Sequence, residues 1–246
     1  MGLTRLLSRP REREQEPEDE APKVDTDAPQ AATEAPKVAT VLAFANQKGG
    51  VAKTTSTLNL AAALGEQGFK VLCIDMDPQG NLTMSQGLNP DSIERSMFDV
   101  LVHRLPIDHV IHQTEVDLAV SSIDLAGAEL ALSSMIGRER ALEKALMAAK
   151  NEYDYILIDT PPILPASESL VMARAADAAV LCARRDYSRI DQVAEAHRRL
   201  EEAGVKAAGA VLNGIPSRNY AQRYGSYYYN RTRLPRRLRK SEASPN

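Results

Sequence analysis

The fold is decided by the stretch Asn46-Gln47-Lys48-Gly49-Gly50-Val51-Ala52-Lys53-Thr54-Thr55. An apolar run at 41–45, typical of a strand, precedes it, and a helical pattern at 56–64 follows it. A glycine-rich turn between a strand and a helix points backbone N–H groups at an anion, and the helix dipole favours negative charge there. The stretch therefore predicts a phosphate-binding loop.

The residue types in this loop suit a nucleoside triphosphate with magnesium. Lys53 would reach the β- and γ-phosphates, and the Thr54 hydroxyl would bind Mg²⁺. Gln47 and Ala52 stand where the strict G-x-x-x-x-G-K-[ST] pattern has glycines, and Lys48 is an additional lysine. A glycine-rich surface turn is the alternative, and the flanking strand and helix argue against it. The predicted nucleotide-binding set in the loop is Lys48, Gly49, Gly50, Val51, Ala52, Lys53, Thr54 and Thr55.

From residue 40 onward, strand-like runs alternate with helical patterns. The runs are apolar almost throughout, as expected for parallel strands that are buried on both faces. This order predicts an α/β fold with a doubly wound, mostly parallel sheet, whose sites lie at the carboxyl ends of the strands. The expected strands are 40–46, 70–75, 116–120, 155–159, 178–183 and 208–213, and the expected helices are 54–67, 92–102, 124–150, 166–175 and 190–203.

Composition divides the 246 residues into three parts. Residues 1–38 are rich in Pro and Glu and are predicted to be a disordered tail. Residues 39–216 form the predicted nucleotide-binding domain, and residues 217–246 form a tail rich in Tyr and Arg, with eight basic residues and one acidic residue. No run reaches the roughly 18 apolar residues of a membrane-spanning helix, and the two cysteines lie in apolar runs, so we expect a cytoplasmic protein.

Two strand ends carry carboxylates suited to a metal ion. Asp75 and Asp77, two residues apart at the end of the second run, can serve a metal and a water together. A strand-terminal Asx turn, which Pro78 would also produce, is the alternative. The fourth run is four apolar residues ending in Asp159, a pattern in which the carboxylate holds the water shell of Mg²⁺. The stiff segment 160–165 is predicted to form a switch loop near the γ-phosphate.

Three segments together resemble the deviant Walker A, A′ and B motifs of the ParA/MinD family of ATPases. They are Lys-Gly-Gly-x-x-Lys-Thr-Thr at 48–55, Asp-x-Asp-Pro-Gln-Gly-Asn at 75–81 and Ile-Asp-Thr-Pro-Pro at 158–162. Between them, 96–101 and 123–130 are similar to segments of ParA-type partition ATPases. The resemblance covers about residues 41–175. It implies an ATPase that binds Mg²⁺ and ATP, dimerises on ATP, and uses slow hydrolysis to time assembly in chromosome or plasmid partition or intracellular positioning.

The resemblance also implies residue roles. Lys48 would reach across a homodimer to the partner's phosphates, Lys53 would hold phosphates in its own subunit, and Asp77 would orient the attacking water. Mg²⁺ would be held by Thr54, Asp75 and Asp159. Asn213 matches the position that reads adenine, and an Asn that caps a strand exit is an equal alternative. If Ala52 needs a positive φ, alanine there costs roughly 1 kcal/mol.

After residue 177 the chain is more similar to bacterial tyrosine autokinases of polysaccharide synthesis. Five of the eight tyrosines lie in the basic tail. Three interpretations of the tail stay open: a solvated disordered segment, an arm for non-specific DNA, and an autophosphorylation cluster. Gln79-Gly80-Asn81 stands where the kinases usually carry an Arg, which argues against the third. The candidate phosphotyrosines are Tyr224, Tyr227, Tyr228 and Tyr229, and the candidate anion-binding residues are Arg231, Arg233, Arg236, Arg237 and Arg239.

The expected partners follow from the same features. The family resemblance implies a second copy of the chain and an activating protein, and the tail suggests nucleoid DNA. Because the tail lacks a long apolar face, membrane association is expected only through another protein.

Overall fold

A computed structural model describes residues 38–46, 48–161 and 172–216 of the chain. The candidate phosphotyrosines, the candidate anion-binding arginines and most of the predicted N-terminal tail lie outside the described residues. So do residues 162–165 of the predicted switch loop and most of the predicted helix 166–175.

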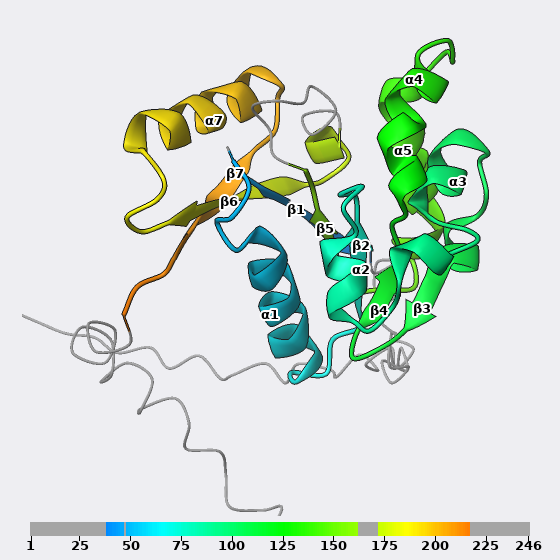
Figure 1. The fold of residues 1–246 in the computed structure, drawn as a ribbon, viewed down its shortest axis with the longest axis horizontal. Coiled ribbons are helices and arrows are strands. Elements are labelled where there is room, and N and C mark those ends of the chain that lie inside the picture. The colour runs from blue at the N-terminus through cyan, green and yellow to red at the C-terminus, as the bar shows by residue number, and fades with distance from the viewer. Residues whose placement is uncertain (1–37, 47, 162–171, 217–246) are drawn as a thin grey trace, which may run out of the picture. The chain divides into compact units, whose positions relative to one another are not determined.

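The described residues form a seven-stranded sheet in the order β3-β4-β2-β5-β1-β6-β7 (Figure 1). Every neighbouring pair is parallel except β3 and β4, which are antiparallel. The predicted α/β fold with a mostly parallel sheet is confirmed. The strands are β1 (Thr40–Ala45), β2 (Val71–Asp75), β3 (Ile111–Gln113), β4 (Asp117–Ala119), β5 (Tyr155–Asp159), β6 (Ala178–Arg184) and β7 (Ala207–Asn213).

Helices connect the strands and cover both faces of the sheet. Among the described residues, none of these helices combines the length and the apolar character needed to cross a bilayer. The α-helices are α1 (Lys53–Gly65), α2 (Asn81–Ser85), α3 (Met97–Val102), α4 (Ala128–Leu132), α5 (Ala141–Ala149) and α7 (Ile190–Glu202), and the 3-10 helices are η1 (Pro90–Ser92), η2 (Ile107–Val110), η3 (Ile123–Gly127) and η4 (Arg138–Arg140).

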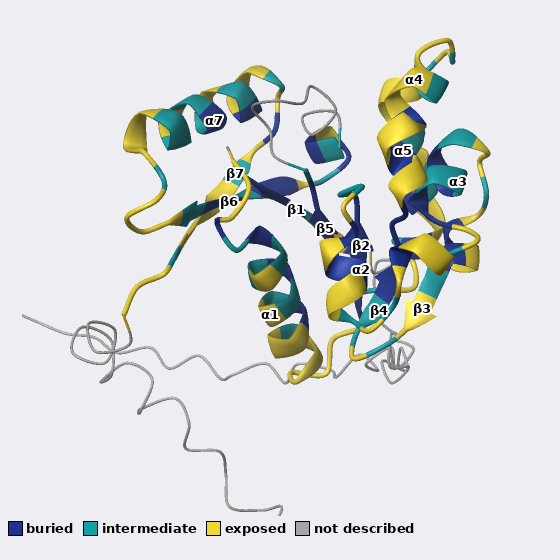
Figure 2. Ribbon diagram, in the orientation of Figure 1, coloured by how far each residue is buried: buried dark blue, intermediate teal, exposed yellow. Residues whose placement is uncertain are grey.

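Alternate side chains of the central strands pack into two separate hydrophobic cores, one on each face of the sheet. Phe44 and Leu157 pack in one core with residues of α1 and α2. Val41 and Ile158 pack in the other core with residues of α3, α5 and α7. This division follows from the pleat, which sends successive side chains to opposite faces. Figure 2 shows the central strands β1, β2 and β5 largely buried, whereas β7 at the edge is mostly exposed.

The prediction of one continuous helix over 124–150 was wrong. The structure divides this stretch into η3, α4, η4 and α5. Gly137 adopts φ +78°, a left-handed conformation that interrupts an α-helix. The apolar periodicity continues across the break, since Leu132 and Leu142 on its two sides both belong to the same core region. Periodicity alone therefore suggested one helix.

Three shorter features also differ from the expectation. The helix expected at 92–102 begins only at Met97, because Ser96 and Asp99 form a capping box that starts α3 there. The short antiparallel strand β3 and the single-turn helix α2 were not predicted. β3 has three residues and α2 has five, so neither is long enough to leave a clear periodic pattern in the sequence.

A matched pair of α5 substitutions tests the packing of the sheet's α3–α5 side. Leu146 is fully buried, while the next residue, Met147, is 66% exposed. Leu146→Ala should lower the free energy of unfolding by about 2–5 kcal/mol in a urea titration, because it leaves a cavity in the core. Met147→Ala should change it by less than about 0.5 kcal/mol. Equal effects of the two substitutions would contradict the described orientation of α5.

Candidate nucleotide-binding site

The predicted motif residues gather at one edge of the sheet. The phosphate loop follows β1. Asp75 is the last residue of β2, with Asp77 two residues later, and Asp159 is the last residue of β5. Because β5 lies between β1 and β2, the carboxyl end of β5 lies between the phosphate loop and the Asp75–Asp77 segment. Asp75 and Asp159 are cross-strand neighbours in the parallel register. The strand order therefore assembles three segments that are far apart in the sequence.

Two left-handed residues shape the phosphate loop. Gly50 has φ +80°, and Ala52, which precedes α1, has φ +63° and ψ +40°. Alanine in this conformation costs roughly 1 kcal/mol relative to a right-handed one. The carbonyl of Ala52 accepts hydrogen bonds from both the backbone N–H and the hydroxyl of Ser56. The first turn of α1 thus holds the loop in the strained conformation that the consensus glycine would adopt freely.

Lys53 and Thr54 meet Asp159 directly. The Lys53 ammonium lies 2.6 Å from one carboxylate oxygen of Asp159, and the Thr54 hydroxyl donates to the other at 2.5 Å. Lys53 is 7% exposed and Asp159 is fully buried. A lysine, a hydroxyl and a strand-end carboxylate within one hydrogen-bonded cluster are the groups that the sequence assigned to phosphate and Mg²⁺.

Asp75 is buried and fully engaged within the protein. One carboxylate oxygen accepts from the backbone N–H and the hydroxyl of Thr83, at 2.9 and 2.8 Å. The other accepts from the backbone N–H of Asp77 at 3.1 Å. Burial raises the pKa of Asp75 to about 7, and the hydrogen bonds from Thr83 oppose that rise. In the described arrangement Asp75 anchors the start of α2, and its predicted role in metal binding stays a prediction.

Asp77 sits in a tight turn after β2. It is half-buried, and one of its carboxylate oxygens accepts from the N–H of Gln79 at 3.0 Å. The Ser121 hydroxyl, at the end of β4, donates to the Asp77 carbonyl at 2.8 Å. The Asx turn expected from sequence as the alternative is therefore present. It holds Asp77 at the strand end and is compatible with the role of orienting a water.

The loop also presents an exposed lysine and an unsatisfied buried oxygen. Lys48 is exposed, and its carbonyl accepts a hydrogen bond from the side-chain amide of Asn46. Among the described residues, Asn46 Oδ1 is the buried side-chain polar atom that has no hydrogen-bond partner. An unsatisfied buried acceptor is costly, and a donor group from a ligand or water at the loop would satisfy it. Sequence reasoning gave Asn46 no role.

Asn213 contacts the loop rather than only ending its strand. Its side-chain amide donates to the carbonyl of Val51 and to the hydroxyl of Ser56, both at 3.0 Å. These bonds connect the end of β7 to the phosphate loop across more than 150 residues of sequence. The position at the loop is consistent with the predicted adenine contact, which stays a prediction.

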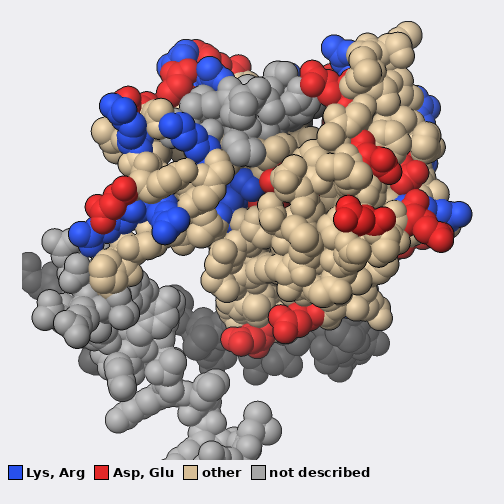
Figure 3. All heavy atoms as spheres, in the orientation of Figure 1, with Lys and Arg blue, Asp and Glu red and all other residues tan. Residues whose placement is uncertain are grey.

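The sequence analysis missed two residues, Arg184 at the end of β6 and Tyr187 in the turn that follows it. Arg184 donates from its guanidinium to the carbonyl of Gly50 at 3.1 Å. The Tyr187 hydroxyl lies 3.6 Å from where a side chain on Gly50 would begin. Arg184 also stacks over the Tyr187 ring at 5.9 Å. Figure 3 shows Lys and Arg near the end of β6, whereas over α7 they are mixed with Asp and Glu. The two successive arginines Arg184-Arg185 are the sequence signal that could have indicated positive charge beside the phosphate loop.

The donor set suits a magnesium ion held together with phosphates. Among the described residues, no group of three or more His, Cys, Asp or Glu side chains is arranged to hold a metal alone. Mg²⁺ in phosphate sites is commonly held by one or two protein oxygens, with phosphate oxygens and waters as the other ligands. Thr54 and Asp159, which already share a hydrogen bond, fit that requirement.

Comparisons with known proteins agree with this geometry. The family model described as an AAA domain matches residues 39–202. The chromosome partitioning protein ParA of Caulobacter vibrioides is 33% identical over 223 residues, which cover 82% of this chain and 83% of ParA. This chain belongs to the ParA/MinD family of P-loop ATPases.

The degree of coverage differs among the relatives of this ParA/MinD-family chain. The sporulation initiation inhibitor protein Soj of Bacillus subtilis is 45% identical over 127 residues, which cover 50% of each protein. An uncharacterized protein of Mycobacterium tuberculosis is matched over only 40% of its length. The chain thus spans half or less of the length of these two curated relatives.

Solved structures share the ParA/MinD-family fold. Cobyrinic acid a,c-diamide synthase from Mycobacterium smegmatis, with a bound ATP analog and magnesium, has a TM-score of 0.68 at 34% identity, covering 78% of this chain and 83% of that one. The kinase domain of the Escherichia coli tyrosine kinase ETK has a TM-score of 0.62 at 24% identity, covering 74% of this chain and 69% of that one, and shows the fold alone.

The buried Asp75 predicts a pH-dependent stability. Its pKa is raised in the folded protein, from 3.8 to about 7, so the folded state holds a proton that the unfolded state releases. The free energy of unfolding should therefore fall as pH rises from about 4 to about 7, with a slope of up to about 1.4 kcal/mol per pH unit. Urea titrations without nucleotide or Mg²⁺ measure that slope.

Two variants complete this test. Asp75→Asn removes the titrating carboxyl and should flatten the slope in this window, whatever its effect on absolute stability. Asp91→Asn changes an exposed carboxyl in η1 and should keep the wild-type slope. A wild-type slope in Asp75→Asn would show that another group causes the dependence.

Proposed function

We propose that this chain is a Mg²⁺-dependent ATPase that dimerises on ATP and uses slow hydrolysis to time its assembly in chromosome or plasmid partition or in intracellular positioning. The observation that carries the proposal is the contact of Lys53 and Thr54 with Asp159, beside a loop that leaves Lys48 exposed. The ParA relative, whose length the chain covers by 83%, supports the partition context.

The site residues act by positioning and by electrostatic stabilisation. When bound, Mg²⁺ would neutralise charge on the phosphates. Lys53 is held by a buried carboxylate, so its ammonium is already placed at the loop before it contacts a phosphate. Asp77, fixed by its turn, would orient the attacking water. Fixed groups of this kind lower the barrier because they need little reorganisation as charge develops.

The exposed lysine is the reason for proposing a nucleotide-bridged dimer. Lys53 is committed to its own subunit by Asp159. Lys48 has a side chain in solvent on the same loop, where it is accessible to a second copy. A lysine that contacts the partner's phosphates would couple nucleotide binding to association, because the interaction exists only when both subunits and ATP are present.

The proposed setting is the cytoplasm, at the nucleoid or with a membrane-associated partner. The basic tail, with its eight Lys and Arg residues, is proposed to bind DNA phosphates without sequence preference. An activating protein would set the time of hydrolysis.

The dimer proposal predicts a separation of binding from association. Lys48→Ala should keep ATP binding within about tenfold of the wild type and lose the ATP-dependent increase in mass seen by light scattering. Lys53→Ala should lose ATP binding itself, because the Lys53 ammonium is proposed to hold the phosphates of the ATP bound in its own subunit. Lys206 is an exposed lysine just before β7, and Lys206→Ala is the control that should behave as the wild type. Normal ATP-dependent dimerisation of Lys48→Ala would refute the proposed role of this lysine.

A tyrosine autokinase is the second candidate, favoured by the cluster of tyrosines in the tail. Incubation with γ-labelled ATP separates the two functions. The ATPase should release labelled phosphate and leave the protein unlabelled. Label on the candidate phosphotyrosines at 224–229, lost in Lys53→Ala, would establish the kinase and refute hydrolysis as the main reaction. A variant with Phe at these four tyrosines should keep the full rate of phosphate release.

A further inference from the structure

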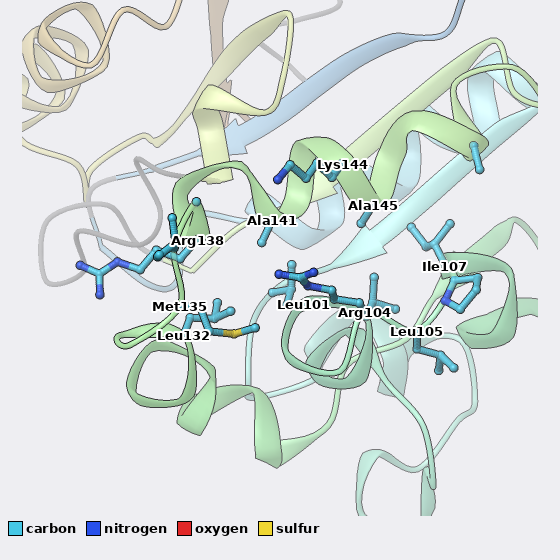
Figure 4. A pocket seen from close by; sticks show the side chains of 15 residues that line it. Leu101, Arg104, Leu105, Ile107, Leu132, Met135, Arg138, Ala141, Lys144 and Ala145 are labelled. Carbon is cyan, nitrogen blue, oxygen red and sulfur yellow. The ribbon is translucent and has the colours of Figure 1, made fainter.

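An apolar groove lies on the α3–α5 side of the sheet, away from the phosphate loop. It has a volume of about 290 Å³ and is bounded by α3 and η2 on one side and by η4 and α5 on the other (Figure 4). We name it the α3–α5 groove. Leu101, Leu105 and Ile107 line the first side, and Ala141 and Ala145 line the second.

The groove exists because α5 places small side chains toward it. Ala141, Ala145 and Ala148 follow one another at helical spacings of four and three residues, so they share one face of α5. Leu146, on the buried face of the same helix, packs in the core. Alanines on the face toward α3 leave space that larger side chains would fill.

Three cations surround this apolar surface. Arg104 follows α3, while Lys144 comes from α5, and Figure 4 shows their side chains on opposite sides of the groove with Arg138 toward one end. The described residues that line the groove include no Asp or Glu. Both carboxylate oxygens of Glu143 accept hydrogen bonds from Arg140, and Lys144 attracts the same carboxylate only from a greater distance.

The rim carries an apolar side chain that the fold leaves in water. Ile136 is 98% exposed, and it precedes Gly137, the residue that interrupts the helical pattern. The left-handed turn at Gly137 thereby holds an isoleucine beside the groove instead of within a helix. A large apolar side chain exposed next to an apolar groove is typical of a binding surface.

We propose that the α3–α5 groove binds an acidic amphipathic helix of a partner protein. Leucine-type side chains on one face of that helix would enter the groove and cover Ile136. Acidic residues beside them would pair with Arg104, Arg138 and Lys144. This is the helix-in-groove mode of recognition, with charge complementarity that selects the partner. The cations on both sides of the apolar lining are the reason for choosing an acidic partner helix as the occupant.

A synthetic peptide tests the proposal on the full-length chain without nucleotide. The probe is a fluorescent helical peptide of about 18 residues, with leucines at i, i+3, i+4 and i+7 and glutamates beside them. The matched probe has glutamine in place of every glutamate. Fluorescence anisotropy should show at least about tenfold tighter binding of the acidic peptide, and added salt should weaken that binding.

Three variants locate the binding surface. Lys144→Glu and Arg104→Glu should each weaken binding of the acidic peptide by about tenfold, and Ile136→Ser should weaken binding of both peptides. Lys206→Glu makes the same charge change far from the groove and should bind as the wild type. Urea titrations check that each variant is folded.

Other outcomes overturn the proposal. Equal binding of both peptides, or equal loss in Lys206→Glu and Lys144→Glu, would show non-specific attraction. Self-association without nucleotide that Lys144→Glu abolishes would replace the partner with a second copy of the chain. Because no nucleotide is present, failure here is distinguishable from failure of the proposed ATPase.

Discussion

The contact of Lys53 and Thr54 with Asp159 is the interaction on which the rest of the site depends. Lys53 and Thr54 precede Asp159 by 106 and 105 positions in the sequence. They meet it because β5 lies beside β1 in the sheet. The same end of β5 also bonds to both neighbouring strands, once through its backbone and once through a side-chain hydroxyl. The carbonyl of Asp159 accepts from Met76 after β2, and the Thr160 hydroxyl donates to Phe44 in β1. One strand end therefore aligns all three motifs.

Around that contact, buried polar groups position the second motif. Thr83 donates to Asp75 and accepts from the backbone N–H of Ser121, whose hydroxyl reaches the Asp77 carbonyl. A satisfied network of this kind holds its members in one arrangement. Burying Asp75 lowers stability at neutral pH, since its carboxylate must lose its hydration. The arrangement therefore trades some stability for a fixed turn at Asp77.

The two faces of the sheet have different surroundings. α1 and α2 cover one face, and α1 begins at the phosphate loop. α3 and α5 cover the other face, and the α3–α5 groove lies between them. A second pocket shares Leu101 and Ala141 with the groove and reaches Pro78 and Pro161, which lie within the second and third motifs. The helical layer around the groove is thus also packed close to the carboxyl ends of β2 and β5.

The sequence by itself determined the α/β class, all six parallel strands to within one residue at each end, and the family, because buried parallel strands and phosphate loops have local signatures. Asp159 was assigned to the candidate site in this way, from the four apolar residues that precede it. Only the tertiary structure decided that Asp75 binds Thr83, that Asn213 and Arg184 hold the loop, and that Gly137 divides a helix to leave a groove. These outcomes depend on contacts between distant residues and on the backbone angle of one glycine. Neither produces a periodic pattern that can be read along the chain.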